Sequence, residues 1–198
     1  SNAIITRGGA EVTVKDISVG DKVSVSAKDG ELSYTESDAA PGSAPGGAPG
    51  GFGGSSEVTQ GSSANTISTG GEYSGESYSS TGDDENALRI DGAAVTLSGV
   101  TVSKSAGSSS NPENGDFYGV NAAILATNGA TVDIKDADIS SSAQNGNGVF
   151  SYGSGTTVNI SDSTINTTAD NSGGIQTTGG GTTNAADLTV TTAGNSSA

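Results

Sequence analysis

Short stretches in the C-terminal part of the chain alternate between apolar and polar residues with a period of two. Each stretch is rich in β-branched residues and bounded by Gly, Asn or Ser, and successive side chains of a strand point to opposite faces. The apolar pairs are Val95/Leu97, Val132/Ile134 and Val158/Ile160. The pattern therefore predicts short strands with one buried face rather than helices.

These stretches belong to a repeat that is marked by glycine. Gly92, Gly129, Gly155 and Gly181 form one column, at intervals of 37, 26 and 26 residues. Further columns follow in register: Leu97/Ile134/Ile160, Val102/Ile139/Ile165 and Ala123/Val149/Ile175. The fourth copy is one residue short, so that Val190 takes the place of Ile165. A unit repeated at this length indicates a stacked solenoid.

The first interval is longer than the others, and its surplus lies between Val102 and Val120. This segment is rich in Ser, Gly, Asn and Pro, a composition typical of a surface loop. The apolar columns resume after it, as they do when one turn of a solenoid carries an insertion.

The repeat length also indicates the kind of solenoid. One copy of about 26 residues holds three short strands and three turns but cannot bury its own apolar side chains. Stacked copies can, because paired strands lie about 4.8 Å apart, which would bring Val132 onto Val158. The period exceeds the roughly 18 residues of a left-handed hexapeptide turn. We therefore predict an all-β fold, a right-handed parallel β-helix over residues 62–198.

The first 61 residues divide into three segments. Ser1-Asn2-Ala3 matches the remnant of a cleaved affinity tag and is left out of the fold. Residues 4–37 predict a small β-hairpin segment, either a cap on the helix or part of a separate domain. Its expected turns are Gly20-Asp21, between Val12/Val14 and Val23/Val25, and Asp29-Gly30, before Leu32 and Tyr34. Residues 38–61 are rich in Pro and Gly and predict a linker.

The pattern stops at Ala198, where another turn is expected to begin. We therefore expect the natural helix to continue and the sequence to be truncated at this end. A bare end leaves strand edges unpaired, which favours end-to-end self-association of the fragment.

Composition and charge exclude several classes of function. Seven Lys and Arg against 22 Asp and Glu give a net charge of −15, which argues against nucleic acid as a partner. No apolar run is long enough for direct membrane insertion. The chain has no Cys and no His, so thiol chemistry and the commonest general base are both missing.

Four segments carry a resemblance to a known family: Asp83–Ile90, Asp116–Ala123, Asn145–Phe150 and Asp170–Ile175. They resemble adhesin-like β-helix surface proteins of gut bacteria over roughly residues 57–198. The resemblance implies a pectate-lyase-like fold and an extracellular, cell-surface location. It supplies no ligand and no catalytic residue.

Four aromatic residues are candidates for ligand binding, because aromatic rings stack on sugar rings. If Val149 points inward, Phe150 and Tyr152 point outward, and the inserted segment ends in Phe117-Tyr118. The four form a carbohydrate-binding groove in one interpretation. In the other, the insertion folds back and packs its aromatic residues on that face.

Asp136 and Asp162 are candidates for a metal site, since they share one column and their carboxylates would repel each other one strand apart. Either both side chains turn into solvent or a cation lies between them, and calcium suits a site made of oxygen ligands. The acidic run Asp83-Asp84-Glu85 admits the same two interpretations. No other cofactor is expected.

The function that these features favour is a non-catalytic, adhesin-like surface module that binds or presents to a host surface or a glycan. The alternative is a carbohydrate-active enzyme, a polysaccharide lyase or glycosidase, of which this chain is a fragment. Lyase chemistry needs cations to stabilise the developing negative charge, and Lys135 is the only basic residue after Lys104. Hydrolysis needs only two carboxylates, for which the candidates are Asp133, Asp136, Asp138, Asp162 and Asp170.

Overall fold

The computed structural model describes residues 4–7, 10–12, 23–28, 31–36 and 58–197. The chain forms two compact units, Ser1–Gly54 and Ser55–Ala198, which are described separately.

The N-terminal unit is a four-stranded sheet in the order β2-β1-β4-β3. The strands are β1 (Ile4–Arg7), β2 (Ala10–Val12), β3 (Val23–Lys28) and β4 (Glu31–Glu36). Strands β3 and β4 pair antiparallel, as the predicted turn at residues 29–30 requires, although that turn lies outside the described residues. The predicted pairing of the Val12 strand with the Val23/Val25 strand is wrong. Val12 pairs with Ile5 of β1, which takes the place expected for β3, and β2 and β3 lie at opposite edges.

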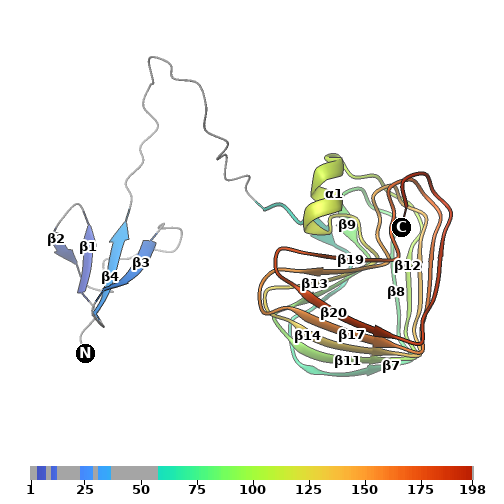
Figure 1. Ribbon diagram of the computed structural model, residues 1–198, viewed down its shortest axis with the longest axis horizontal. Coiled ribbons are helices and arrows are strands. Elements are labelled where there is room, and N and C mark those ends of the chain that lie inside the picture. The colour runs from blue at the N-terminus through green and yellow to red at the C-terminus, as the bar shows by residue number, and fades with distance from the viewer. Residues whose placement is uncertain (1–3, 8–9, 13–22, 29–30, 37–57, 198) are drawn as a thin grey trace, which may run out of the picture. The chain divides into compact units, whose positions relative to one another are not determined.

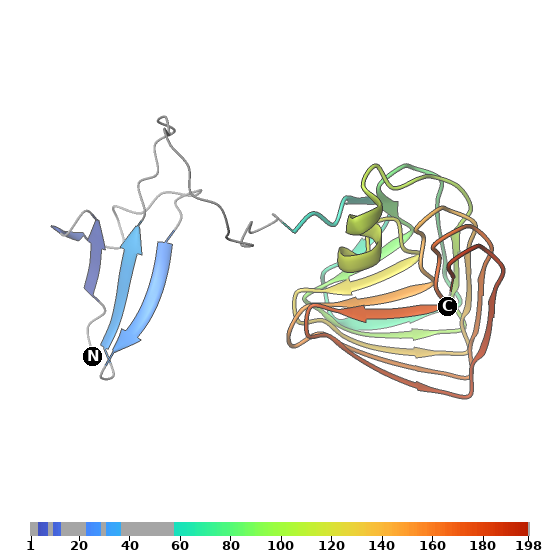
Figure 2. The same ribbon diagram turned by 45° about the horizontal axis from the view of Figure 1, so that its top comes forward.

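The C-terminal unit is a parallel β-solenoid built from three sheets of five strands each (Figures 1 and 2). The first sheet contains β6 (Thr66–Ile67), β10 (Leu88–Asp91), β13 (Ile124–Thr127), β16 (Val149–Tyr152) and β19 (Ile175–Thr178). The second contains β7 (Gly71–Ser74), β11 (Ala94–Ser98), β14 (Thr131–Lys135), β17 (Thr157–Ser161) and β20 (Thr182–Ala186). The third contains β8 (Ser77–Ser80), β12 (Thr101–Lys104), β15 (Asp138–Ser141), β18 (Thr164–Thr167) and β21 (Thr189–Thr192).

Each turn of the solenoid, here called a rung, contributes one strand to every sheet. In Figure 1 the chain runs anticlockwise as it advances toward the viewer, which is the right-handed sense. Two short strands, β5 (Ser62–Ser63) and β9 (Glu85–Asn86), form a further parallel pair at the N-terminal rungs. The predicted right-handed parallel β-helix with turns of about 26 residues is therefore confirmed.

The register of the second and third sheets follows the predicted columns. Val132 pairs with Val158, Ile134 with Ile160, and Ile139 with Ile165. Val190 takes the next place in the last of these columns, as the shorter fourth copy requires.

Two details of the predicted register are wrong. Val158 pairs with Thr183 rather than Asn184, because the residue missing from the fourth copy is lost before β20. The repeated glycine of that copy is therefore Gly180. In the first sheet Val149 pairs with Ile124 rather than Ala123.

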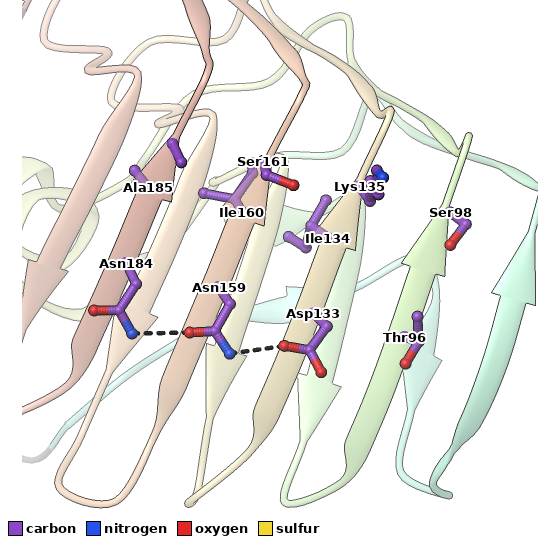
Figure 3. A pocket seen from close by; sticks show the side chains of 11 residues that line it. Thr96, Ser98, Asp133, Ile134, Lys135, Asn159, Ile160, Ser161, Asn184 and Ala185 are labelled. Atoms are coloured by element: carbon purple, nitrogen blue, oxygen red, sulfur yellow. Dashed lines mark hydrogen bonds between the residues drawn. The ribbon is translucent and has the colours of Figure 1, made fainter.

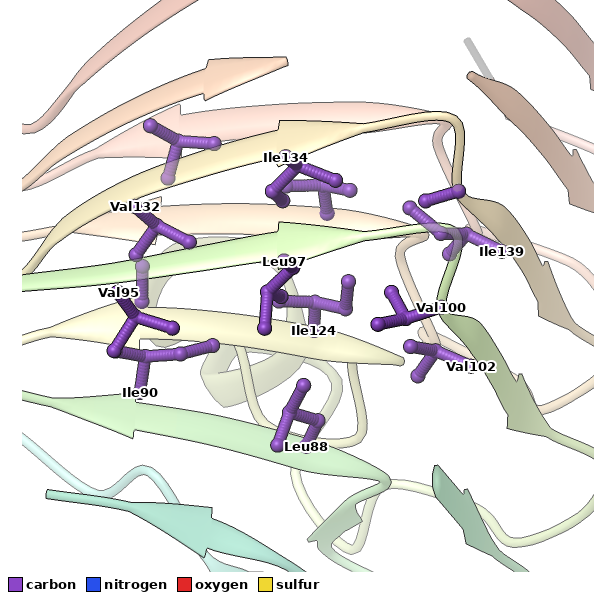
Figure 4. Close-up of a cluster of buried hydrophobic side chains, with 14 of the residues drawn as sticks. Leu88, Ile90, Val95, Leu97, Val100, Val102, Ile124, Val132, Ile134 and Ile139 are labelled. Carbon is purple, nitrogen blue, oxygen red and sulfur yellow. The ribbon is translucent and has the colours of Figure 1, made fainter. Parts of the chain in front are cut away.

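The core consists of the inward-pointing apolar residues of successive rungs, stacked one above another (Figure 4). Burying one such Val, Leu or Ile side chain contributes roughly 1.5–3 kcal/mol. The residues labelled in the figure are all at most 3% exposed: Leu88, Ile90, Val95, Leu97, Val100, Val102, Ile124, Val132, Ile134 and Ile139. A single rung cannot bury its own apolar side chains, which are covered by the neighbouring rungs.

One corner of the solenoid, after the strands of the second sheet, requires a left-handed backbone in every rung. Such a backbone is costly for most L-residues, and Gly, Asn and Asp tolerate it best. The corner is occupied by Gly75 (φ 68°), Gly99 (60°), Asp136 (54°), Asp162 (50°) and Asp187 (52°). The recurrence of Gly and Asp in this column therefore follows from backbone geometry.

The insertion after β12 contains a helix, α1 (Pro112–Tyr118), where its composition predicts a loop. Asn111 caps it by accepting a hydrogen bond from Glu113 N (3.0 Å), and Pro112 follows at the first helical position, a typical start signal. Gly119 ends the helix with φ 78°. Helix α1 packs over the outer face of the first sheet (Figures 1 and 2). Among the described residues, no helix is long and apolar enough to span a membrane.

Candidate functional site

Helix α1 determines how much of the four candidate ligand-binding aromatic residues is exposed. Phe150 points outward from β16 as expected, but it is 0% exposed and packs with Ala122, Leu125 and Tyr152. The prediction that Phe150 lines a ligand-binding groove is therefore wrong, because a fully covered ring cannot stack on a sugar. The packing interpretation concerned the aromatic residues of the insertion itself, of which Tyr118 packs against Tyr152 while Phe117 is exposed.

The other three aromatic residues lie around this small cluster. The rings of Tyr118 and Tyr152 meet edge to face, with centroids 5.6 Å apart and an interplanar angle of 88°. Both tyrosines are half-buried. Phe117 is 56% exposed and is the aromatic residue of the helix that faces solvent. Ligand binding by these three residues stays a prediction.

Asp136 and Asp162 occupy equivalent places in adjacent rungs, as predicted. Both lie at the left-handed corner, and Lys135 Nζ approaches Asp162 Oδ2 at 3.8 Å. The described part of the chain contains no group of three or more acidic residues able to hold a metal ion together. The calcium site stays a prediction, and the backbone already accounts for aspartate at both positions.

The acidic run at residues 83–85 anchors the insertion. Asp83 Oδ1 accepts hydrogen bonds from Ser108 N (2.7 Å) and Ser108 Oγ (3.1 Å), and Asp84 Oδ1 accepts one from Ser110 N (2.8 Å). The backbone hydrogen bond from Ser108 is the main cause that lowers the pKa of Asp83. These carboxylates therefore hold a loop in place.

Lys104 is a buried cation on the third sheet. Its side chain is 0% exposed, and Nζ donates to Ser80 Oγ (3.2 Å) and to Gly82 O. Burial lowers the pKa of Lys104, while the nearby carboxylates of Glu85, Asp83 and Asp84 oppose that shift. Because Nζ is buried and donates its hydrogen bonds to groups of the neighbouring rung, the charge of Lys104 is not available to a substrate.

A groove of about 430 Å³ lies on the outer face of the second sheet, bordered by two rows of side chains (Figure 3). We call it the outer groove. Its floor is formed at Ile134 and Ile160, whose side chains are in the core. One row consists of Thr96, Asp133, Asn159 and Asn184, and the other of Ser98, Lys135, Ser161 and Ala186.

The first row is held together by a ladder of amide hydrogen bonds. Asn184 Nδ2 donates to Asn159 Oδ1 (2.8 Å), and Asn159 Nδ2 donates to Asp133 Oδ1 (2.7 Å) (Figure 3). The three residues are in register on β14, β17 and β20. The ladder therefore fixes the side chains in one orientation, at the spacing of the strands.

The ladder leaves polar groups free for a ligand. A primary amide has two donors and two acceptor lone pairs, and Asn159 uses one of each within the ladder. The opposite row adds the hydroxyl of Ser98 and the ammonium group of Lys135, whose side chain is 60% exposed. It also adds the hydroxyl oxygen of Ser161, which donates its proton to Asp162 Oδ2 (3.1 Å) and can still accept. The groove thus presents both donors and acceptors to any hydroxyl-rich molecule along it.

The amides of this site are not among the residues predicted from the sequence. Asn159 lies between Val158 and Ile160, and Asp133 lies between Val132 and Ile134, so period-two alternation already places both on the outer face. Asn184 was assigned to an apolar column because of the one-residue slip before β20. Attention to outward as well as inward columns identifies the first two residues.

The fold and the outer groove together place the chain in a class of proteins, the parallel β-solenoids that have a polar groove across one sheet. Comparisons with protein-family models, with curated proteins and with solved structures each give no match to this chain.

Proposed function

We propose that this protein is a non-catalytic, cell-surface module that binds uncharged glycans along the outer groove. The observation that carries the proposal is the ordered ladder of Asp133, Asn159 and Asn184. Amides and carboxylates that are already oriented lose little conformational entropy when they bind sugar hydroxyls.

The spacing of the groove suits a polymer. Strands repeat about every 4.8 Å across the sheet, and each rung adds a polar side chain to both rows except at Ala186. A sugar residue in an extended chain advances by a comparable length. Successive sugars would therefore meet equivalent groups on successive rungs.

The charge of the protein favours a neutral ligand. The net charge is −15, and the groove contains one ammonium group, that of Lys135, which pairs with Asp162 at its edge. Uronate or sulfate polymers would be repelled by the surrounding carboxylates. A neutral glycan gains the same hydrogen bonds without that repulsion.

The enzymatic alternative receives less support from the groove. Glycoside hydrolysis uses two carboxyl groups on either side of the scissile bond. The lining residues include one carboxylate, that of Asp133, which is engaged by Asn159. The adhesin-like role and the extracellular location rest on the resemblance of four sequence segments and are part of the proposal.

The test is a glycan array that holds neutral and acidic polysaccharides, probed with the full chain and two variants. Asn159→Ala breaks the ladder at its centre, and Asn166→Ala is the matched control, an exposed amide on β18 of the third sheet. We expect Asn159→Ala to weaken binding about tenfold, the equivalent of 1.4 kcal/mol, and Asn166→Ala to leave it unchanged.

Turnover is measured on the same polysaccharides as release of reducing ends or unsaturated products. The proposal expects none. Retention of acidic polymers alone, equal binding by both variants, or cleavage of any polysaccharide would contradict it.

A further inference from the structure

A second, smaller hollow lies away from the outer groove, between α1 and the turns that precede β16 and β19. Its volume is about 160 Å³, well below the range of about 300–1,000 Å³ for pockets that hold drug-sized ligands. A single ring suits a space of this size. It is lined by Asp116, Asn147, Asn171, Gly173, Gln176 and Ser196.

Asn147 is the most buried polar side chain of this pocket, with 3% of its surface exposed. Its Oδ1 accepts a hydrogen bond from Gly173 N (2.8 Å), which fixes the orientation of the amide. Its Nδ2 donates to no residue in the described part of the chain. The N–H groups of Nδ2 are therefore free to donate to an acceptor that enters the pocket.

Asp116 supplies an acceptor on the α1 side. Its Oδ1 accepts a hydrogen bond from Asn145 Nδ2 (3.1 Å), and its main-chain oxygen accepts one from Gln176 Nε2 (3.4 Å). Its second carboxylate oxygen accepts none from the described residues. The carboxylate is therefore held in place while one oxygen stays free for a ligand.

Phe117, the exposed ring of α1, follows Asp116 directly. Its main-chain oxygen accepts a hydrogen bond from Thr178 Oγ1 (2.6 Å), two residues beyond Gln176 on β19. The segment 116–117 thus lies along β19, with a polar pocket at one residue and a solvent-facing ring at the next. Aromatic rings stack on the apolar face of a sugar, and the polar groups bind its hydroxyls.

We propose that this pocket binds a single uncharged sugar residue, such as the end of a glycan chain. A cation fits the site less well. Calcium takes 6–8 oxygen ligands, whereas the pocket holds one carboxylate and the unpartnered group of Asn147 is an N–H donor. A sugar hydroxyl both donates to Asp116 and accepts from Asn147.

The inference shares its ligand class with the proposed function but uses another face of the solenoid. The two sites have no lining residue in common, so each can fail without the other.

The test is a titration of the full, isotopically labelled chain, followed by amide NMR. The probes are the methyl glycosides of glucose, galactose, mannose and N-acetylglucosamine, each added to high millimolar concentration. We expect at least one probe to shift the signals of Asp116 and of the Asn147 and Gln176 side-chain amides. Phe117→Ala and Asp116→Asn should each lower the affinity for that probe about tenfold. Asn159→Ala, in the outer groove, should leave the affinity for that probe unchanged.

Three results would overturn the inference. They are no shift at the pocket with any of the four probes, shifts confined to the outer groove, or equal affinity of Phe117→Ala, Asp116→Asn and the unaltered chain. Spectra of the free variants check that each is folded. Shifts at the pocket in a protein that binds no polysaccharide on the array would leave the inference standing and contradict the outer groove alone.

Discussion

At the scale of single residues, the same amino acid has opposite roles in this protein according to what covers it. Phe117 and Phe150 both point away from the core of the solenoid, yet one is 56% exposed and the other is 0% exposed. Period-two alternation predicts the outward direction of Phe150 correctly. It does not predict burial, because the cover comes from a helix inserted more than 30 positions earlier.

Replacing each phenylalanine by alanine tests this assignment. Phe150→Ala removes a ring packed among Ala122, Leu125 and Tyr152 and should lower the free energy of unfolding by about 3–5 kcal/mol. Phe117→Ala should change it by no more than about 0.5 kcal/mol. Urea denaturation followed by circular dichroism measures both values. Similar losses from the two variants would show that α1 does not cover the first sheet.

At the scale of elements, the strands are more predictable than the insertion. The apolar columns of the second and third sheets place Val132 on Val158 and Ile139 on Ile165 because β-branched residues recur at a fixed spacing. The first sheet was misaligned by one residue since both Ala123 and Ile124 are apolar and either fits the column. Helix α1 has seven residues, too few for a periodic signal, and its one start signal, Asn111 followed by Pro112, is equally typical of a loop.

The loop that leads into α1 gives a prediction about pH. Hydrogen bonds from Ser108 lower the pKa of Asp83 below its ordinary value of 3.8. A carboxylate with a lowered pKa stabilises the fold above its ordinary pKa, and this contribution is lost as the pH falls through the lower, folded-state value. Asp83→Asn should therefore be less stable than the unaltered chain at neutral pH.

The difference between the two proteins should shrink as the solution is acidified below the ordinary pKa of aspartate. Thermal melting of both across this range gives the measurement. Asp138→Asn, an exposed aspartate on β15 for which the structure gives no side-chain hydrogen bond, is the control. A difference that persists unchanged in acid would show that Asp83 does not anchor the loop through its charge.

At the scale of the whole molecule, the solenoid converts a sequence repeat into lines of like side chains. Inward lines form the core, and outward lines form the amide ladder of the outer groove. The number of rungs in register decides how long a ligand the groove can hold. A composition with Gly at 32 of 198 residues is by itself typical of a low-complexity chain, and it is the period of the repeat that indicates the packing.

The most direct test of this account is to link two successive rungs covalently. Ser103 and Ser140 are paired on β12 and β15, with their Oγ atoms 3.3 Å apart, and the chain contains no cysteine that could interfere. Neighbouring strands lie within the Cα separation that a disulfide spans. The double variant Ser103→Cys/Ser140→Cys should therefore oxidise readily to an intramolecular disulfide in the folded protein.

The control is Ser103→Cys/Asn166→Cys, in which the second cysteine is two rungs away because Asn166 pairs with Ser140. That separation, roughly 10 Å, is too long for a disulfide. Mass spectrometry under mild oxidation measures both variants. The account predicts a disulfide in the first variant and free thiols in the second, and the reverse result, or equal linkage in both, would contradict the stacking of rungs.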